Sequence, residues 1–364
     1  VIPKMDVLLF LLIMLAFLSV GRTVTGKIWL LSFNSRTEAF IFSSILGSII
    51  ASVMVTSLAF LGQVSSLSCW AILAILLASG LGFINDLRKW KLKISLVFFP
   101  LSPLKTLTQI ILGTLCLLSL SLALIPAFAT DALVYHLAVP KAYLQAGGVI
   151  NIPNNVFSFY PQHMEMLYLL ALGLGTEHLA QLVGLGVVFL LLIALYQYYR
   201  QNGSAKYAFL VPALFLSTPT FFAVAYSAYV DLQAATYTFM AFYAWENWRS
   251  RKQAGWFYLM TAFVGAALAT QVNAVIALPI ALLGVVIQSE MPPKKVLVHC
   301  LILTLGALLL ILPWWGRNYF FTGNPFAPFF MQIFGGDQGM NWDLERSLQH
   351  FQYLSTYGMG HGIL

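Results

Sequence analysis

Charged residues are scarce in this chain of 364 residues, because Asp, Glu, Lys and Arg together make up only 9% of it. In soluble globular domains, about a quarter of the residues are charged. Hydrophobic residues make up 60% of the chain, and the mean hydropathy is +0.84. The shortage of charge excludes an ordinary soluble globule and indicates a membrane protein with several spans. The alternation typical of an outer-membrane barrel is absent, so we expect the spans to be helices.

Cysteine and the common motifs of soluble enzymes are also missing or rare. The three cysteines, Cys69, Cys116 and Cys300, each lie inside an apolar run without paired spacing. They are predicted to be small apolar side chains and not disulfides or metal ligands. There is no nucleophile elbow, Walker loop, Rossmann glycine pattern or metal-ligand spacing. These absences count against chemistry on soluble nucleotides and predict no cofactor or dedicated metal site, while the use of a divalent metal stays open.

The basic residues give the chain a net charge of +7, but they are not gathered into the single stripe expected of a nucleic-acid-binding protein. Instead, 15 of the 19 Lys and Arg fall in short connections on one side of the predicted topology. These connections are 22–36, 88–105, 200–206, 249–252 and 294–295. Positive residues collect on the cytoplasmic side of a membrane. The loops 129–163 and 225–231 and everything after Trp315 are therefore predicted to lie outside the cytoplasm.

Apolar runs predict an all-α bundle with about 10–11 transmembrane helices. The candidate spans are about 5–21, 39–62, 67–84, 107–128, 164–199, 207–225, 231–248, 256–271, 272–288 and 296–315. The run 164–199 is too long for one span and is broken by Gly173 and Gly175, so we expect a short half-helix followed by a full helix. The first run lacks a signal-peptide cleavage pattern and is predicted to be a retained span. Because the first residue is not Met, further residues are expected before it.

The segment 130–143 places unusual chemistry at the end of the apolar run 107–128. Asp131 and Tyr135 stand one helical turn apart on a predicted interfacial helix, which Pro140 should kink or divide and Gly147-Gly148 should end. Asp131 is the candidate catalytic group. Equally, it could do no more than cap this helix by accepting bonds from free backbone N–H groups. The candidate binding residues of this segment are Tyr135, His136 and Lys141.

Further polar residues are predicted on the same side of the membrane. Asp231 opens the span 231–248, where it could again be only a helix cap, and Glu165 follows the polar segment 160–163. Acids from separate loops favour a convergent site, because ionisable groups at a membrane edge are costly. Arg317, beside Asn318, is the best candidate anion ligand, since a guanidinium binds phosphate oxygens in pairs. Its alternative role is a snorkelling anchor beside interfacial Trp.

Four stretches of the chain form a pattern in order and approximate spacing. They are Asp131-Ala132-Leu133-Val134-Tyr135-His136-Leu137 with Pro140 and Tyr143; Tyr160-Pro161 with Glu165-Met166-Leu167-Tyr168; Ala228-Tyr229-Val230-Asp231-Leu232; and Pro313-Trp314 with Arg317-Asn318 and Thr322-Gly323-Asn324-Pro325. This pattern resembles the polytopic bacterial glycosyltransferases of the C-type (GT-C) fold, which are related to protein O-mannosyltransferases and to the lipid A aminoarabinose transferase. The likeness covers residues 107–330.

The resemblance implies transfer of a sugar from a polyprenyl-phosphate carrier to a glycan, lipid or protein acceptor. The reaction would take place on the outer face of the bacterial inner membrane. The family's catalytic base would correspond to Asp131, a suitable group for taking a proton from an acceptor hydroxyl. Arg317 would hold the leaving phosphate. Residues 1–106 then form an N-terminal three-helix region, 107–330 a GT-C-like core, and 331–364 an outer surface segment that we expect to be incomplete.

One departure from the family pattern supports a different function. Relatives often place a Lys after Ala-Thr in the long helical hairpin, whereas this chain has Ala269-Thr270-Gln271. Gln271 cannot supply that charge. The second hypothesis is therefore a non-catalytic accessory subunit of a larger membrane complex. A lipid or solute transporter is a weaker third hypothesis, because the polar residues are predicted to cluster on one face and not to line a path through the membrane.

Overall fold

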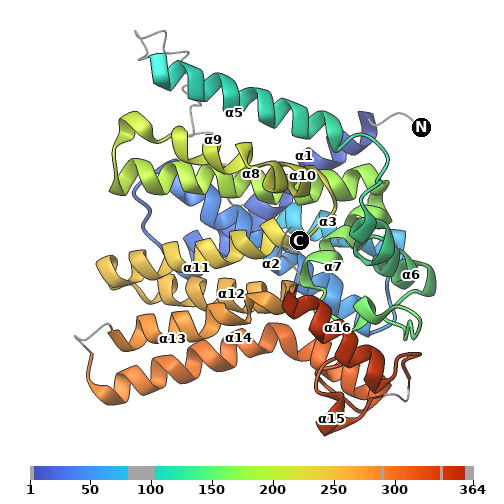
Figure 1. Cartoon of the computed structure of the whole chain (residues 1–364). Coiled ribbons are helices and arrows are strands. Elements are labelled where there is room, and N and C mark those ends of the chain that lie inside the picture. Colours follow the sequence, from blue (N-terminus) through green and yellow to red (C-terminus); the bar gives the residue numbers. More distant parts are fainter. Residues whose placement is uncertain (1–3, 81–102, 288–290, 337–338, 357–364) are drawn as a thin grey trace, which may run out of the picture.

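The computed structural model describes residues 4–80, 103–287, 291–336 and 339–356, which form helices and turns with no β-strand among them. The predicted basic loop 88–93, the end of the predicted span 67–84 and the last residue of 272–288 lie outside the described residues. Figure 1 shows the long helices lying side by side, with their connections gathered at two opposite ends of the bundle. This arrangement is that of an all-α, multi-pass membrane protein.

Five helical segments are long and apolar enough to cross a membrane. The first, Met5–Ile28, joins α1 (Lys4–Thr23) to a π-helical turn, η1 (Val24–Ile28). The others are α2 (Arg36–Phe60), α5 (Pro103–Leu122), α8 (Glu177–Asn202) and α14 (Pro293–Thr322). A sixth candidate span consists of two helical segments with a bend of 78° between them. The first segment is Ala205–Ser217, which includes α9 (Leu210–Ser217), and the second is α10 (Pro219–Tyr226). The bend falls at Thr218, which Pro219 keeps in an extended conformation.

Shorter helices complete the bundle. The apolar ones are α3 (Ser66–Ser79), α7 (His163–Leu174), α12 (Ala254–Thr270) and α13 (Ala277–Ile287), the last preceded by the 3-10 turn η6 (Val272–Ile276). A more polar helix, α11 (Asp231–Arg251), forms a hairpin with α12. The break that we predicted in 164–199 is present, because the 12-residue α7 ends at Gly175 and the 26-residue α8 follows. The half-helix and full helix were thus correctly predicted.

The helices share a continuous core that begins with close contact between α1 and α2. A Cβ added to Gly47 would lie 1.8 Å from the carbonyl oxygen of Phe17, and one added to Gly21 would lie 1.7 Å from that of Ser43. Small residues let apolar helices approach to backbone contact in this way. Side chains of α1, α2 and α3 pack in the same core as those of α7, α11 and α12. Helices α5, α9 and α10 pack on the far side of α8.

The two ends of the bundle differ in their chemistry. The basic end, on the left in Figure 1, comprises residues 24–35, 200–207, 249–253 and 291–295. The loop end, on the right, comprises residues 123–162, 226–231 and 317–356, including α6 (Ala138–Ala146), α15 (Met331–Phe334) and α16 (Leu344–Thr356). The half-helix α7 lies beside α6, toward the loop end (Figure 1). The sorting of basic connections to one end agrees with the charge pattern of the sequence, for the connections that the structure describes.

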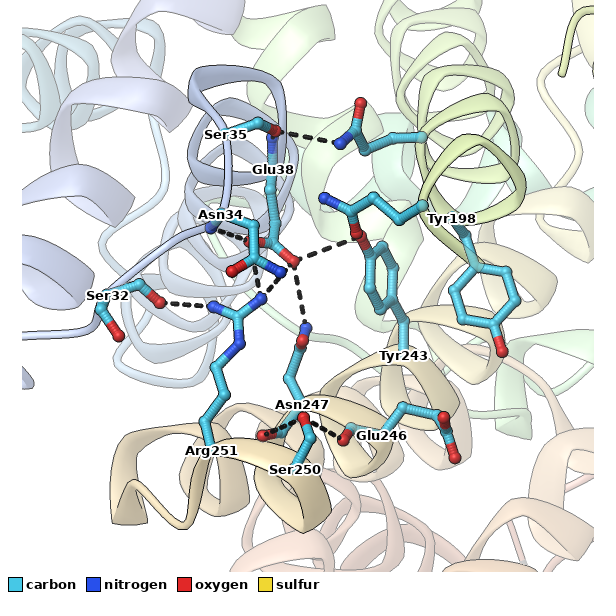
Figure 2. Close-up of polar contacts among 12 residues, drawn as sticks. Ser32, Asn34, Ser35, Glu38, Tyr198, Tyr243, Glu246, Asn247, Ser250 and Arg251 are labelled. Atoms are coloured by element: carbon cyan, nitrogen blue, oxygen red, sulfur yellow. Dashed lines mark hydrogen bonds and ion pairs between the residues drawn. The ribbon is translucent and has the colours of Figure 1, made fainter. Parts of the chain in front are cut away.

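A buried carboxylate fastens the basic end (Figure 2). Glu38, in the first turn of α2, is fully buried, and both of its oxygens lie 2.9 Å from Nη2 of Arg251 on α11. Oε2 also accepts a hydrogen bond from the backbone N–H of Asn34 at 2.6 Å, and Oε1 one from Nδ2 of Asn247 at 3.3 Å. The hydroxyl of Tyr243 lies 3.2 Å from Oε1. Every lone-pair direction of Glu38 is thus engaged, and the residue joins α2 to α11.

We expect Arg251→Ala to lower the free energy of unfolding by about 3–5 kcal/mol, because it leaves a buried carboxylate without its cation. Arg249→Ala is the matched control. It removes the same charge from an exposed pair, in which Nη2 lies 3.2 Å from Oε1 of Glu246, and should cost about 1 kcal/mol or less. Denaturant titration of the detergent-solubilised protein measures both. Equal losses in the two variants would contradict the structural role of Glu38.

Candidate functional site

The segment that carries Asp131 forms two short helices at the loop end. A π-helical turn, η3, runs from Ala132 to His136, and α6 follows after Leu137. Pro140 is the third residue of α6, where its missing N–H breaks no helical bond. Gly147 ends α6 in the left-handed conformation with φ of +77°. The division near Pro140 and the stop at Gly147 were both predicted, but the π-helical turn, a feature frequent at functional sites, was not.

Neither Asp131 nor Asp231 caps its helix with its side chain. Asp131 already has helical backbone angles, φ −67° and ψ −34°, and makes no capping bond; its Oδ2 instead accepts a hydrogen bond from the hydroxyl of Tyr135 at 3.1 Å. Asp231 is the first residue of α11, whose N-cap position belongs to Val230. The capping alternatives that the sequence left open therefore do not account for these two acids.

His136 and Glu165 form a buried pair beneath the π-helical turn. Nδ1 of His136 lies 2.8 Å from Oε1 of Glu165, and each side chain is only 4% exposed. Oε2 of Glu165 is buried without a hydrogen-bond partner among the described residues. Unlike Glu38, whose lone pairs are taken, Glu165 keeps an oxygen that can still accept a bond. It lies in the first turn of α7, where the helix dipole favours negative charge.

Three carboxylates from separate segments lie close enough to act on the hydroxyl of Tyr135. Its burial, followed by the charge of Asp131, that of Glu165, the bond to Asp131 and the charge of Asp231, raises the pKa of Tyr135 well above its ordinary value. The phenol therefore stays protonated at physiological pH and donates to Asp131. Its ring stacks on Phe157, with ring centroids 4.6 Å apart. The structure thus brings together Asp131, Tyr135, His136, Glu165 and Asp231.

Gln271, the departure from the glycosyltransferase pattern, contacts this group. It follows the last residue of α12, where the predicted spans 256–271 and 272–288 meet, and its Nε2 donates to Oδ1 of Asp231 at 2.7 Å. Asp231 is exposed and Gln271 is partly exposed. Gln271 thus presents a neutral amide to Asp231.

Arg317 is buried near the loop end of α14, only 3% exposed. A guanidinium has five N–H groups, and all five have acceptors here. Nε and Nη2 donate to Oδ1 of Asn318 at 3.0 and 2.8 Å, Nη1 to Oε1 of Gln162 at 3.0 Å and to the hydroxyl of Tyr143 at 3.3 Å, and Nη2 to the carbonyl of Tyr160 at 3.0 Å. A phosphate could bind only by displacing one of these acceptors. The assignment of Arg317 as a phosphate ligand stays a prediction.

Asn318 extends this junction. Its Nδ2 donates to the carbonyls of Phe159 at 2.8 Å and Ala327 at 3.1 Å. Arg317 and Asn318 therefore fix α14 to α6 and to the segment that leads into α7, the two elements that flank the carboxylates. Lys141, the last predicted binding residue, is exposed on α6.

Comparison with protein families assigns the chain to one family. Residues 5–363 match the model of a family described as a domain of unknown function, DUF8201. The chain belongs to this family. The matched range runs through all three regions proposed from the sequence. Comparisons with curated proteins and with solved structures found no match.

Two polar contacts of this DUF8201 chain were missed by sequence reasoning. The first is that of Glu38, which the sequence placed only at the edge of a span. Ser35 and Glu38 have the spacing of a capping box, which was a usable signal. In the structure, Oγ of Ser35 accepts a hydrogen bond from the backbone N–H of Glu38 at 3.0 Å. His350 on α16 lies with Nε2 2.7 Å from the hydroxyl of Tyr160, and burial lowers the pKa of this His. Nothing in the sequence pattern indicated the second contact, because it joins segments 190 positions apart.

Polar groups also occur in the middle of the bundle, which corrects the expectation that they lie on one face alone. Helix α2 carries buried hydroxyls at every fourth position. One of them, Oγ of Ser52, lies 3.0 Å from Nδ1 of His163, and the next, Oγ of Ser48, lies 3.3 Å from the hydroxyl of Tyr237. The hydroxyl residues at this spacing are Ser44, Ser48, Ser52 and Thr56. The argument that made a transporter the weakest hypothesis therefore loses part of its basis.

Two cavities lie away from the carboxylates. One is at the basic end beside Trp248 and His299, and the other, about 580 Å³, lies on the surface of α14 between Gly316 and Gly323. Within the described residues, no group of three or more His, Cys, Asp or Glu side chains is arranged to hold a metal ion. The candidate site is therefore a group of convergent acids at the loop end, in which Asp231 is exposed and Glu165 is buried.

Arg317→Lys tests the structural role of the guanidinium. A Lys keeps the charge but has three donors in place of five, so buried acceptors lose their partners and we expect a loss of about 2–4 kcal/mol in the free energy of unfolding. The control is Arg346→Lys on exposed α16, which should change stability by less than about 0.5 kcal/mol. Denaturant titration compares them. A fully stable Arg317→Lys protein would show that the five contacts do not hold the loop end together.

Proposed function

We propose that this protein transfers a sugar from a polyprenyl-phosphate carrier to a glycan, lipid or protein acceptor at the loop end of the bundle. The observation that carries this proposal is the convergence of Asp131, Glu165 and Asp231 on Tyr135, with neither aspartate used as a helix cap. A positioned carboxylate suits a reaction in which an acceptor hydroxyl must lose its proton. We assign that role to Asp131.

The proposed chemistry needs no group beyond the lipid-linked donor. The acceptor oxygen attacks the anomeric carbon, its proton passes to Asp131, and the bond between that carbon and the phosphate oxygen breaks to release polyprenyl phosphate. Tyr135, held protonated, donates to one carboxylate oxygen and so fixes the orientation of the other. Lys141 is the exposed cation of α6, two residues from the Tyr143 that contacts Arg317, and is proposed to meet the carrier phosphate.

We further propose a GT-C-like bundle with about 10–11 crossings in a bacterial inner membrane. This number is supported by the six candidate spans together with the shorter helices α3, α11, α12 and α13, which lie alongside them. The basic connections support an orientation with the basic end in the cytoplasm and the loop end outside it. The donor would then approach Asp131 from the outer leaflet.

A second candidate function is favoured by two specific contacts. The neutral amide of Gln271 donates a hydrogen bond to Asp231, and all of the N–H groups of Arg317 donate to acceptors within the protein. Both contacts suit an accessory subunit that keeps the fold without turnover. In that case the acids would stabilise the loop end or bind a partner chain.

Paired substitutions of Asp131 separate these two functions. Asp131→Asn keeps the size of the side chain and the contact with Tyr135 but removes the basic oxygen, so transfer should fall by roughly 100-fold or more. Asp131→Ala should lose as much activity. Because Asp131 makes no capping bond, Asp131→Asn should keep near-native thermal stability, whereas Asp131→Ala also removes the acceptor of the Tyr135 hydroxyl and should lose about 1 kcal/mol. The assay follows label from a polyprenyl-phosphate sugar in vesicles supplied with cell-envelope extract.

Glu345→Gln, at an exposed acid on α16, is the control for loss of negative charge at the loop end and should leave turnover unchanged. Wild-type turnover in Asp131→Asn would remove the catalytic assignment.

A further inference from the structure

Helix α14 carries a long apolar stripe that no other described part of the chain covers. Leu305, Leu309 and Leu312 are exposed, and their spacing of three and four residues places them on one side of the helix. The stripe continues to Tyr319 and Phe320, which are exposed at the loop end, Phe320 by 83%. Because α14 is a candidate span, this stripe is a surface that faces lipid.

The chain then turns and folds back along α14. Gly323 ends the helix in the left-handed conformation, with φ of +74°. Phe326 returns to Trp315, with ring centroids 5.1 Å apart. Trp315 lies about 20 residues beyond Lys295, which is roughly 30 Å of helix and close to the thickness of the hydrocarbon core of a membrane. Phe326 therefore lies near the level of the membrane surface at the loop end.

Residues 323–336, which we call the aromatic hairpin, contain no Asp, Glu, Lys, Arg or His. The hairpin includes α15, on which Ile333 is 73% exposed and Phe334 is also exposed. The rings of Phe330 and Phe334 lie 5.9 and 5.5 Å from that of Phe326, centroid to centroid. Phe330 is exposed and has φ of 56°, where Gly is favoured because a Cβ is strained. The hairpin thus keeps large apolar side chains on its surface, one of them at a strained position.

A buried amide satisfies backbone groups inside the aromatic hairpin. Asn324 is fully buried, and its Nδ2 donates to the carbonyls of Phe329 at 2.8 Å and Gly335 at 3.1 Å. Its Oδ1 accepts a hydrogen bond from the N–H of Phe326 at 2.9 Å. Backbone polar groups are costly in an apolar surrounding unless the protein itself supplies their partners. Asn324 supplies such partners from within the hairpin, which leaves the exposed surface to apolar side chains.

We propose that the aromatic hairpin inserts into the boundary between headgroups and acyl chains of the leaflet at the loop end. Ile333 and its exposed aromatic neighbours provide the inserted surface, because such side chains are favoured at this depth. The apolar stripe of α14 continues into this surface, so the occupant is bilayer lipid and not a soluble partner. Insertion also fixes the junction at Arg317 relative to the membrane, because Nδ2 of Asn318 donates to the carbonyl of Ala327 in the hairpin.

The accessibility of a spin label in lipid vesicles tests the proposal. The full chain, with its three cysteines replaced by Ala, carries one nitroxide at Leu309→Cys, Ile333→Cys or Glu345→Cys. Oxygen concentrates among acyl chains and a polar nickel chelate stays in water, so the ratio of their effects on the label reports its depth. Leu309 on α14 is the lipid reference, and exposed Glu345 on α16 is the water reference. The ratio at Ile333 should lie between the two references and several-fold above that at Glu345.

A label at Phe334→Cys repeats the measurement on the aromatic hairpin, so misfolding of one variant does not decide the outcome. Two results would overturn the proposal. A ratio at both hairpin positions equal to that at Glu345 would place the hairpin in water. Low access of both oxygen and the nickel chelate would mean that protein covers the hairpin, as in contact with a second copy of the chain. Neither result bears on sugar transfer at Asp131, because the labelled positions lie outside the group of acids.

Discussion

The cost of burying charge in an apolar bundle governs how this chain places its few ionisable residues. Each buried charge needs partners, and the completeness of the partner set differs from site to site. Glu38 has Arg251 and several neutral donors, and all five N–H groups of Arg317 have acceptors. Glu165 has His136 on one oxygen and no partner on the other. Complete sets hold helices together, whereas the incomplete set lies beside the acids for which we propose chemistry.

The two complete sets stabilise opposite ends of the molecule. At the basic end, Glu38 and Arg251 join helices whose residues lie more than 200 positions apart in the chain. At the loop end, Arg317 fastens α14 to α6 and to the entrance of α7, the elements that carry the polar surface around Tyr135. The position of Asp131 therefore depends on a guanidinium that does not touch it and whose partners are a backbone carbonyl and neutral side chains.

Periodicity and local breaks in the sequence predicted much of this fold. The half-helix in 164–199 and the stop at Gly147 follow from glycine and from the length of the apolar run, which act locally. The partners of Arg317 could not be predicted, because they depend on packing between distant segments. Spacing alone also left Asp131 undecided between capping and chemistry, and only the backbone angles and the bond from Tyr135 exclude capping. The buried hydroxyls of α2 were not predicted, because Ser and Thr scarcely lower the hydropathy of a long apolar run.

The most direct measurement is the fate of a labelled polyprenyl-phosphate sugar in vesicles that contain the purified wild-type protein and a cell-envelope extract. The account predicts that label leaves the lipid carrier for a product that does not partition with it, and that polyprenyl phosphate accumulates in equal amount. It also predicts that heat-treated protein does neither. If neither undecaprenyl- nor dolichyl-phosphate sugars are consumed by protein that is folded and monodisperse, the transferase proposal is contradicted and the accessory-subunit function takes its place.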